Sequence, residues 1–244
     1  MDLNTETFGP IRRLLAVGGV ALAGAVALSG CGILDDAASS DSTDDTEVNS
    51  DQYDAAADAA EGDCLPEPPV GGDNSTFAID CSDPTAFWTL TAIEADPGIT
   101  AEADGSIADP TPIYELCGDE VGANIPGAAW TDWNMIYDQT TLNVDYLFCL
   151  EANGNPTADG ATPVYPSAEG ECFSSADYMI GTYPCDSATV DSTIVDVVEV
   201  DPAEWATAEA DAESIATDEC AGDWSYYIAA VDQFGGTAAI YCTN

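Results

Sequence analysis

Cysteines and carboxylates are the residues of this chain whose types and spacing could do chemistry. The 244 residues include nine cysteines and 46 acidic residues, but no histidine and only two basic residues, Arg12 and Arg13. Carboxylates can act as acids or bases and bind hard cations, whereas cysteines can act as nucleophiles, bind metals or form disulfides. The positions of these residues along the chain decide among such uses.

The segment that ends at Cys31 predicts export and lipid attachment. After Arg12 and Arg13, residues 14–28 form an uncharged run of Leu, Ala, Val and Gly, the arrangement of a secretory signal. The run closes with Leu28-Ser29-Gly30-Cys31, which resembles the bacterial lipobox, where the cysteine thiol accepts diacylglycerol. We therefore expect a lipoprotein signal peptide over residues 1–30 and acyl chains, palmitate among them, on Cys31.

An uncleaved membrane span is the alternative for this segment, but a spanning helix needs about 20 apolar residues and this run is shorter. The arginine pair leaves Sec and twin-arginine export both open. Lipidation at Cys31 predicts a protein held on the outer, extracytoplasmic face of the cell membrane.

The charge is almost entirely of one sign. Only Asp2 and Glu6 precede Cys31, so 44 of the 46 acidic residues follow it, without any Lys, Arg or His. Such a chain repels nucleic acid, which binds proteins mainly through Lys and Arg, and we exclude that class of partner. It also repels anionic lipid headgroups, so the lipid on Cys31 must anchor the protein alone. The charge suits either a saline or divalent-rich envelope or simple solubility.

Residues 31–60 are rich in Asp, Ser, Thr and Ala, and we expect a disordered acidic tether there.

From residue 61 the chain repeats itself. Each copy opens on an acidic-Gly-acidic-Cys motif and continues with a second cysteine, a strand-like segment that ends in Asp-Pro, a helical stretch with a third cysteine, an Asp-Trp pair and a final aromatic-Cys pair. The motifs lie at 61–64, 81, 88–97, 117, 132–133 and 148–149, and at 169–172, 185, 193–202, 220, 223–224 and 241–242.

This repeat predicts two homologous domains, 61–150 and 167–244, separated by the turn-favouring residues 151–166. Residues 88–93, 193–200, 224–230 and 237–242 have strand patterns. Asp201 and Pro202 favour a helix start, and a shorter helix is expected over residues 112–121. The predicted fold class is α+β: two tandem small disulfide-bonded domains, each an antiparallel sheet with one packed helix.

The eight cysteines after Cys31 form two sets of four, which in an exported chain predicts disulfides. A zinc or iron-sulfur site is disfavoured, because no C-x-x-C pair and no histidine occur. Three pairings per domain remain open. We favour the pairings in which the first cysteine begins a strand and the second ends the neighbouring one, together with a pairing of the remaining two. These are Cys64–Cys81, Cys117–Cys149, Cys172–Cys185 and Cys220–Cys242.

The chain from Cys31 onward cannot form a Ser-His-Asp triad, a Lys Schiff base or a cationic phosphate clamp. The two Asp-Gly sites, Asp104-Gly105 and Asp159-Gly160, lack the aspartic protease motif. We therefore expect no enzyme and no cofactor. Calcium is the alternative, since hard cations prefer oxygen ligands, but no D-x-D-x-D-G array identifies the metal ligands.

Tryptophan is the remaining candidate for a binding role. Trp133 and Trp224 recur at matching places in the two copies, which favours core packing. Trp130 has no such counterpart, and we therefore consider it the candidate for an exposed contact with a partner.

The first copy carries Gly62-Asp63-Cys64, Cys81-Ser82-Asp83-Pro84, Cys117 and Cys149, and the second copy is looser. In this order the motifs resemble the septum-formation-related domain of actinobacterial envelope lipoproteins. That family usually has a histidine after the proline, where this chain has Thr85 and, in the second copy, Thr189. The resemblance implies a non-enzymatic role at the cell envelope or septum, with an envelope protein or wall polymer as partner. The alternative is a surface protein that binds divalent cations.

Overall fold

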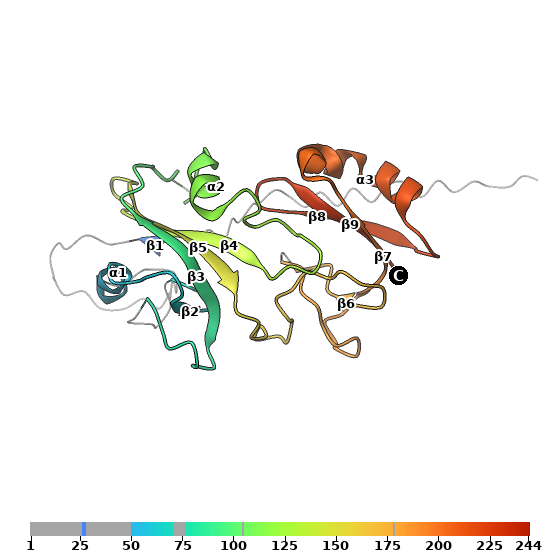
Figure 1. Cartoon of the computed structure of the whole chain (residues 1–244), viewed down its shortest axis with the longest axis horizontal. Helices are drawn as coiled ribbons and strands as arrows, with labels where there is room; N and C mark the ends of the chain where they lie inside the picture. The colour runs from blue at the N-terminus through green and yellow to red at the C-terminus, as the bar shows by residue number, and fades with distance from the viewer. Residues whose placement is uncertain (1–25, 28–49, 71–76, 104, 178) are drawn as a thin grey trace, which may run out of the picture.

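The computed structural model describes residues 26–27, 50–70, 77–103, 105–177 and 179–244 (Figure 1). Cys31 and most of the predicted signal peptide and tether lie outside these residues. Within them, no helix is long and apolar enough to cross a membrane. The fold is α+β, with two sheets and few helices, as predicted.

The first sheet has five strands in the order β1-β4-β5-β3-β2. They are β1 (Val26–Ala27), β2 (Cys64–Pro66), β3 (Ala86–Ala95), β4 (Thr131–Tyr137) and β5 (Val144–Ala152). All neighbours are antiparallel except β1, which runs parallel to β4. Aromatic and branched side chains in β3, β4 and β5 suit this half-buried sheet. Helix α2 (Thr111–Cys117) covers one face, where Ile113 packs with Met135 and Leu147.

The second sheet has four antiparallel strands in the order β6-β7-β9-β8. They are β6 (Cys172–Phe173), β7 (Ser192–Glu199), β8 (Tyr226–Val231) and β9 (Thr237–Thr243). A 3-10 turn, η1 (Pro202–Glu204), leads into helix α3 (Trp205–Glu219). Asp201 caps this turn as predicted, because its side chain accepts a hydrogen bond from Ala203 N at 2.9 Å. Three alanines of α3, Ala208, Ala212 and Ala216, pack closely on the sheet.

Both halves follow the same path. The first runs β2-β3-α2-β4-β5 and the second β6-β7-α3-β8-β9, with strand orders β4-β5-β3-β2 and β8-β9-β7-β6. Each has a bulge at the same place, after which Ala92 pairs with Cys149 and Asp196 with Cys242. The extra strand β1 belongs to the predicted signal peptide, so cleavage before Cys31 would leave two sheets of identical order.

Strand pairing corrects one part of the sequence comparison. Cys149 pairs with Trp133, whereas Cys242 pairs with Tyr227, so Trp133 and Tyr227 are structural equivalents. Trp224 lies before β8 and corresponds to Trp130, which lies before β4. The predicted equivalence of Trp133 and Trp224 is therefore wrong. Asp132-Trp133 and Asp223-Trp224 look alike in the sequence, but they lie three residues apart once the strands are aligned. The sequence alone does not show that the two pairs are not equivalent.

The predicted disordered tether is wrong at its end. Helix α1 (Ser50–Ala56) lies within it, and Ala56 is fully covered by the first sheet's core. The Tyr53 ring meets the Tyr146 ring of β5 at a centroid distance of 5.5 Å, edge to face. Tyr53 and the neighbouring alanines supply the apolar contact that the preceding Asp and Ser residues lack.

The segment between the sheets is also packed. Strand β5 extends through Ala152, and Tyr165 is buried in the same hydrophobic cluster as Phe148 of the first sheet and Tyr241 of the second. Thr162 forms an isolated bridge with Thr182. The turn-favouring residues 151–166 therefore form neither helix nor long strand, as predicted, but they join the two sheets through one shared core.

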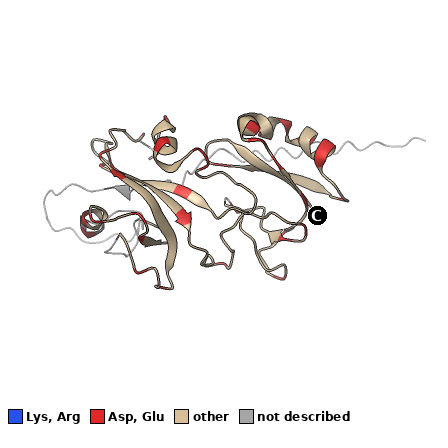
Figure 2. Cartoon of the chain, in the orientation of Figure 1, with Lys and Arg blue, Asp and Glu red and all other residues tan. Residues whose placement is uncertain are grey.

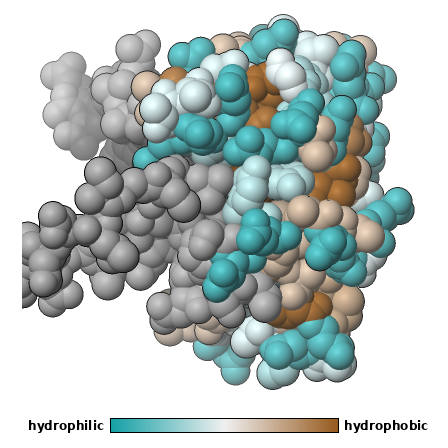
Figure 3. Space-filling model, turned by 90° about the vertical axis from the view of Figure 1, so that its left-hand side faces the viewer, coloured by the Kyte–Doolittle hydropathy of each residue, from teal (hydrophilic) through white to brown (hydrophobic). Residues whose placement is uncertain are grey.

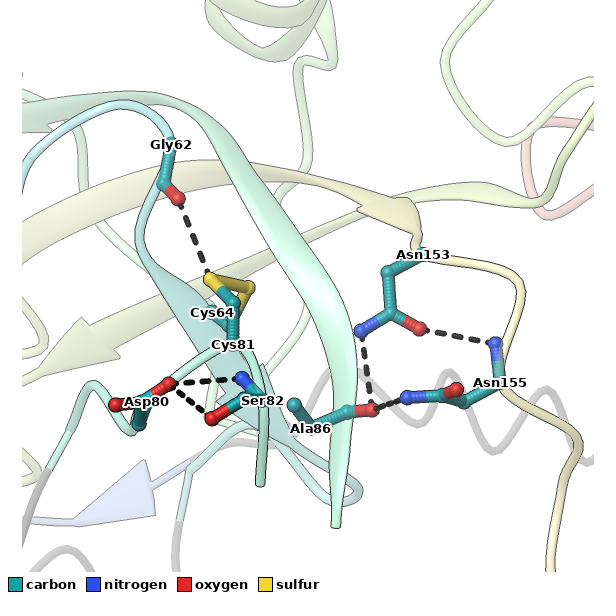
Figure 4. Close-up of a disulfide and its surroundings, with 8 residues drawn as sticks. All are labelled: Gly62, Cys64, Asp80, Cys81, Ser82, Ala86, Asn153 and Asn155. Carbon is teal, nitrogen blue, oxygen red and sulfur yellow. Dashed lines mark hydrogen bonds between the residues drawn. A yellow bond between two sulfur atoms is a disulfide. The ribbon is translucent and has the colours of Figure 1, made fainter. Parts of the chain in front are cut away.

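The structure contains the four disulfides that the sequence favoured. Their Cα–Cα distances are 5.1 Å for Cys64–Cys81, 5.4 Å for Cys117–Cys149, 5.2 Å for Cys172–Cys185 and 6.3 Å for Cys220–Cys242. In each half one disulfide closes the first strand pairing and the other ties the helix to the central strand. Figure 4 shows Cys64–Cys81 beside the carbonyl oxygen of Gly62, which lies 3.7 Å from Cys81 Sγ. Such disulfides are typical of proteins that mature outside the reducing cytoplasm.

Candidate functional site

The two sheets meet at Asp132 and Gln233. Asp132 is the second residue of β4, and Gln233 lies in the hairpin between β8 and β9. Gln233 Nε2 donates a hydrogen bond to Asp132 Oδ1 at 3.2 Å. Gly122 allows this approach, because a Cβ on it would lie 2.6 Å from Gln233 Nε2 and its φ is +73°. The amide thus reaches a carboxylate in the other half of the protein.

Asp232 holds the hairpin in shape beside this contact. Its Oδ1 accepts hydrogen bonds from Phe234 N and Gly236 N, both at 2.8 Å. The Phe234 ring, at the turn, packs on Tyr114 of α2 with a centroid distance of 4.9 Å. The hairpin of the second sheet is therefore seated on the first half by both an aromatic contact and an acid-amide contact.

A small, partly open cavity of about 10 Å³ lies between these residues, large enough for about one water molecule. The residues that line it come from both halves: Gly122, Asn124, Thr131, Asp132, Tyr165, Met179, Val231, Asp232 and Gln233. Asn124, one of these residues, is only 4% exposed.

Burial changes the acidity of the two aspartates. It raises the pKa of Asp132 to about 7, against the lowering effect of the hydrogen bonds from Trp133 N and Gln233, and Glu67 repels the charge further. Burial also raises the pKa of Asp232, although backbone N–H groups of the hairpin oppose the shift. These two carboxylates lie at one junction, and the described residues supply no cation to either.

A second acidic concavity lies at one end of the second sheet. This cleft has a volume of about 540 Å³ and is lined by residues 169–170, 193–196, 221–223 and Asn244. It carries the carboxylates of Glu169, Asp196 and Asp223. Asp196 Oδ2 accepts a hydrogen bond from Ala221 N at 2.7 Å, which holds the loop of the cleft wall. Unlike the junction cavity, this cleft is wide enough to admit a side chain of a partner.

Two further carboxylates converge on one hydroxyl. Tyr183 Oη lies 2.5 Å from Asp159 Oδ2 and 2.8 Å from Asp177 Oδ2. Because the phenol has a single proton, it can donate to only one of the two at a time. Burial and both carboxylates raise the pKa of Tyr183, so the phenol stays protonated and acts as a structural donor.

Trp130 does not occupy the exposed position that the sequence suggested. It is 6% exposed, and its Nε1 donates a hydrogen bond to Ile180 O at 3.2 Å. Its ring lies close to Gly181, where a Cβ would meet Trp130 Cζ2 at 2.8 Å. The prediction of a partner contact at Trp130 is wrong, because the ring fills the shared core between the halves.

The junction residues were missed from the sequence. In the sequence Asp132 is distinguished only as part of an Asp-Trp pair, and Asp232, Gln233 and Asn124 follow no motif. Their only sequence signal is the position of Asp232 and Gln233 in a turn between two strand patterns. Cys31 lies outside the described residues. In the described ranges, no group of three or more His, Cys, Asp or Glu side chains is placed to hold a metal ion.

No family model, curated protein or solved structure matches this chain. The resemblance to the septum-formation-related domain therefore stays a prediction, and function has to be argued from the molecule's own geometry.

Proposed function

We propose that this chain is a lipid-anchored, extracytoplasmic, non-catalytic protein that binds or organises proteins of the cell envelope, at the septum or elsewhere. In this proposal residues 1–30 are removed, Cys31 carries the lipid, and tandem domains at 61–150 and 167–244 form the displayed part. The observation that carries the proposal is the repeated β-β-α-β-β path with equivalent disulfides in both halves. Duplication of a small disulfide-bonded unit suits a module that offers surfaces outside the cell.

The acidic charge of this protein limits the kinds of partner that can bind to it. Within the described residues every charged side chain is acidic, and acidic residues are spread over helices, strands and loops (Figure 2). A basic segment of an envelope protein complements this surface, whereas an anionic wall polymer is repelled. The cleft with Glu169, Asp196 and Asp223 has the volume and the charge to take a Lys or Arg side chain.

The apolar surface supports recognition by charge rather than by hydrophobic docking. The large apolar side chains that are exposed in the described residues are Tyr226 and Tyr227, at 38% and 36%. On the face shown in Figure 3, brown apolar areas are small and lie among hydrophilic side chains. A protein that binds its partner through an apolar interface would expose a larger continuous apolar patch when it is alone.

A photo-crosslinking amino acid tests this surface without changing its charge. We would place it at Ala221 in the cleft and, as the matched control, at exposed Ala210 of α3, in the full-length chain expressed in its own cells. Position 221 should give a discrete adduct with a protein that has a basic segment, and position 210 should not. Adducts of equal yield at both positions, or an adduct with glycan only, would contradict the proposed partner.

Charge variants supply the second arm of the experiment. The double variant Glu169→Gln/Asp223→Asn removes two charges from the cleft, and Asp211→Asn/Glu213→Gln removes two from exposed α3. Because both carry the same net charge, a general electrostatic attraction would weaken equally in the two. Only the cleft variant should lose the adduct at position 221.

A calcium-binding surface protein is the second candidate function. The observation that favours it is the charge, because every charged side chain among the described residues is a carboxylate and hard cations prefer oxygen ligands. Calcium would bind these carboxylates and reduce their mutual repulsion.

A further inference from the structure

Strand β8 is the longest of the strands that lie at the edges of the two sheets. Within the described residues the strand orders leave β1, β2, β6 and β8 at the edges. β1 and β6 have two residues each and β2 has three, ending at Pro66, whereas β8 has six. Proteins commonly protect an edge strand from pairing by keeping it short or by placing charges or proline in it. β8 has none of these protections.

The outer edge of β8 is unpaired in the part of the chain that the structure describes. The backbone groups of this strand bond there only to β9, and no other segment bonds to its N–H or C=O groups. Tyr226 and Tyr227, at its start, are exposed. Ala230 is buried and Val231 lines the junction cavity. The accessible stretch is therefore the first part of the strand.

The equivalent edge in the first half carries an added strand. β8 is the structural equivalent of β4, and β1 is hydrogen-bonded to β4 on the side away from β5. β1, Val26–Ala27, pairs there with Ile136 and Tyr137 and has no charged residue. An uncharged extended segment on β8 would repeat in the second half the arrangement that β1 makes in the first.

Acidic residues lie at both ends of β8. Asp223 comes three residues before Tyr226 and lines the cleft together with Glu169 and Asp196, and Asp232 follows the strand directly. Since a strand advances about 3.3 Å per residue, three residues cover about 10 Å, and a Lys or Arg side chain at the end of an added segment can reach the cleft. A second copy of this chain would bring only further carboxylates to the same place and is repelled.

We propose that a partner segment adds to the edge of β8 as an extended strand, with an uncharged centre on this strand and a Lys or Arg side chain in the neighbouring cleft. This inference rests on the proposed function, because it takes the basic segment of an envelope protein as the occupant and gives its mode of binding. Backbone hydrogen bonds supply affinity in such pairing, and side-chain contacts supply specificity. Pairing of this kind needs no large apolar patch, in keeping with the surface of this protein.

Synthetic peptides can separate strand addition from attraction by charge. The probe has lysines at both ends and alternating valine and threonine between them. The control has the same sequence, but the backbone nitrogens of all its valines and threonines are methylated, which removes their N–H donors and leaves the charge unchanged. Binding to the full-length chain in detergent is measured by fluorescence anisotropy in about 0.15 M KCl, where long-range attraction is screened. The probe should bind about tenfold or more tightly than the control, because several backbone hydrogen bonds are lost in the control.

A photo-crosslinking amino acid at Tyr227 locates the segment in cells. This side chain is uncharged and exposed, so an aromatic crosslinker changes neither the charge nor the core. Position 227 should give an adduct with the same protein as position 221, and mass mapping should place both adducts in one segment with a basic residue. Ala210 of α3 stays the control position, and near-UV circular dichroism checks the folding of the variant.

The two arms distinguish failure of strand addition from failure of the proposed function. Equal binding of the two peptides, or no binding of either, would show that β8 does not take up a strand. An adduct at position 227 between two copies of the chain would make this edge a self-association surface and overturn the inference. An adduct at position 221 without one at 227 would overturn strand addition alone, whereas no adduct at either position would contradict the proposed function as well.

Discussion

Trp130 donates its indole N–H to the carbonyl oxygen of Ile180 at 3.2 Å, and this buried bond joins the two halves of the protein. The ring lies between Tyr165 and Phe87, at centroid distances of 6.4 Å and 6.3 Å. Gly181 leaves the space that the ring occupies. The first half therefore places a tryptophan ring against the backbone of the second half.

Trp130→Phe should lower the free energy of unfolding by about 2 kcal/mol. The smaller ring leaves a cavity, and Ile180 O loses its donor. Chemical denaturation monitored by circular dichroism measures the change. Trp224→Phe is the matched control, because Trp224 occupies the equivalent position but is only partly buried in the second half. An equal loss in the two variants would mean that Trp130 has no special role at the junction.

Much of the fold could be predicted from local patterns. Eight cysteines in two equal sets predict two disulfides in each half, and the alternation in residues 193–200 predicts β7 to within one residue at each end. Asp201 followed by Pro202 marks the start of the helical segment. Such features depend on residues that are neighbours in sequence or repeat at a fixed spacing.

The contacts between the halves could not be predicted in the same way. Gln233 is 101 residues from Asp132, and no local pattern reports that the hairpin folds back onto β4. The counterpart of Trp130, Trp224, can be recognised only when the strand register is known. The two Asp-Trp pairs hide it, because they lie three residues apart once the strands are aligned.

Asp132 should make stability depend on pH between about 4 and 7. In the folded protein burial raises its pKa to about 7, whereas the ordinary pKa of an aspartate in an unfolded chain is 3.8. Between these values the folded state holds a proton that the unfolded state has released, so raising the pH favours unfolding. The contribution is fully present below the unfolded pKa and is lost as pH rises toward 7, with a slope of at most about 1.4 kcal/mol per pH unit.

Asp132→Asn should remove this pH dependence, because the amide does not titrate. The measurement is the free energy of unfolding of both proteins at several pH values in a chelator, so that metal binding does not compete with protons. The neighbouring Glu67 and Asp232 titrate in both proteins, and their effects therefore cancel to a first approximation. A difference between the two proteins that is constant from pH 4 to 7 would contradict the raised pKa of Asp132.

The four disulfides should be reduced in a definite order. Cys81 and Cys185 are exposed, whereas Cys149 and Cys242 are buried in the sheets. A reductant reaches an exposed sulfur more readily, since thiol–disulfide exchange needs direct attack. Under mild reductant, Cys64–Cys81 and Cys172–Cys185 should open before the two disulfides that tie helix to strand. Timed alkylation and peptide mass mapping measure the order, and early loss of Cys117–Cys149 would contradict it.

Cys31→Ala should release the protein from the membrane without unfolding it. The residue lies in the predicted lipobox, outside the described residues, and none of the four disulfides uses it. Because the surface is acidic, the lipid is the only part expected to hold the chain to anionic membranes. Loss of the lipid alone should therefore change location and leave the fold intact.

Fractionation of cells that express either protein measures this change, with circular dichroism as the check on folding. Cleavage and lipidation would also remove β1, which pairs with β4 only through Val26 and Ala27. Strand β4 keeps its full pairing with β5, so the first sheet should survive that loss. If the Cys31→Ala variant stays in the membrane after a wash with high salt, the residues before Cys31 act as the anchor and the lipobox prediction is wrong.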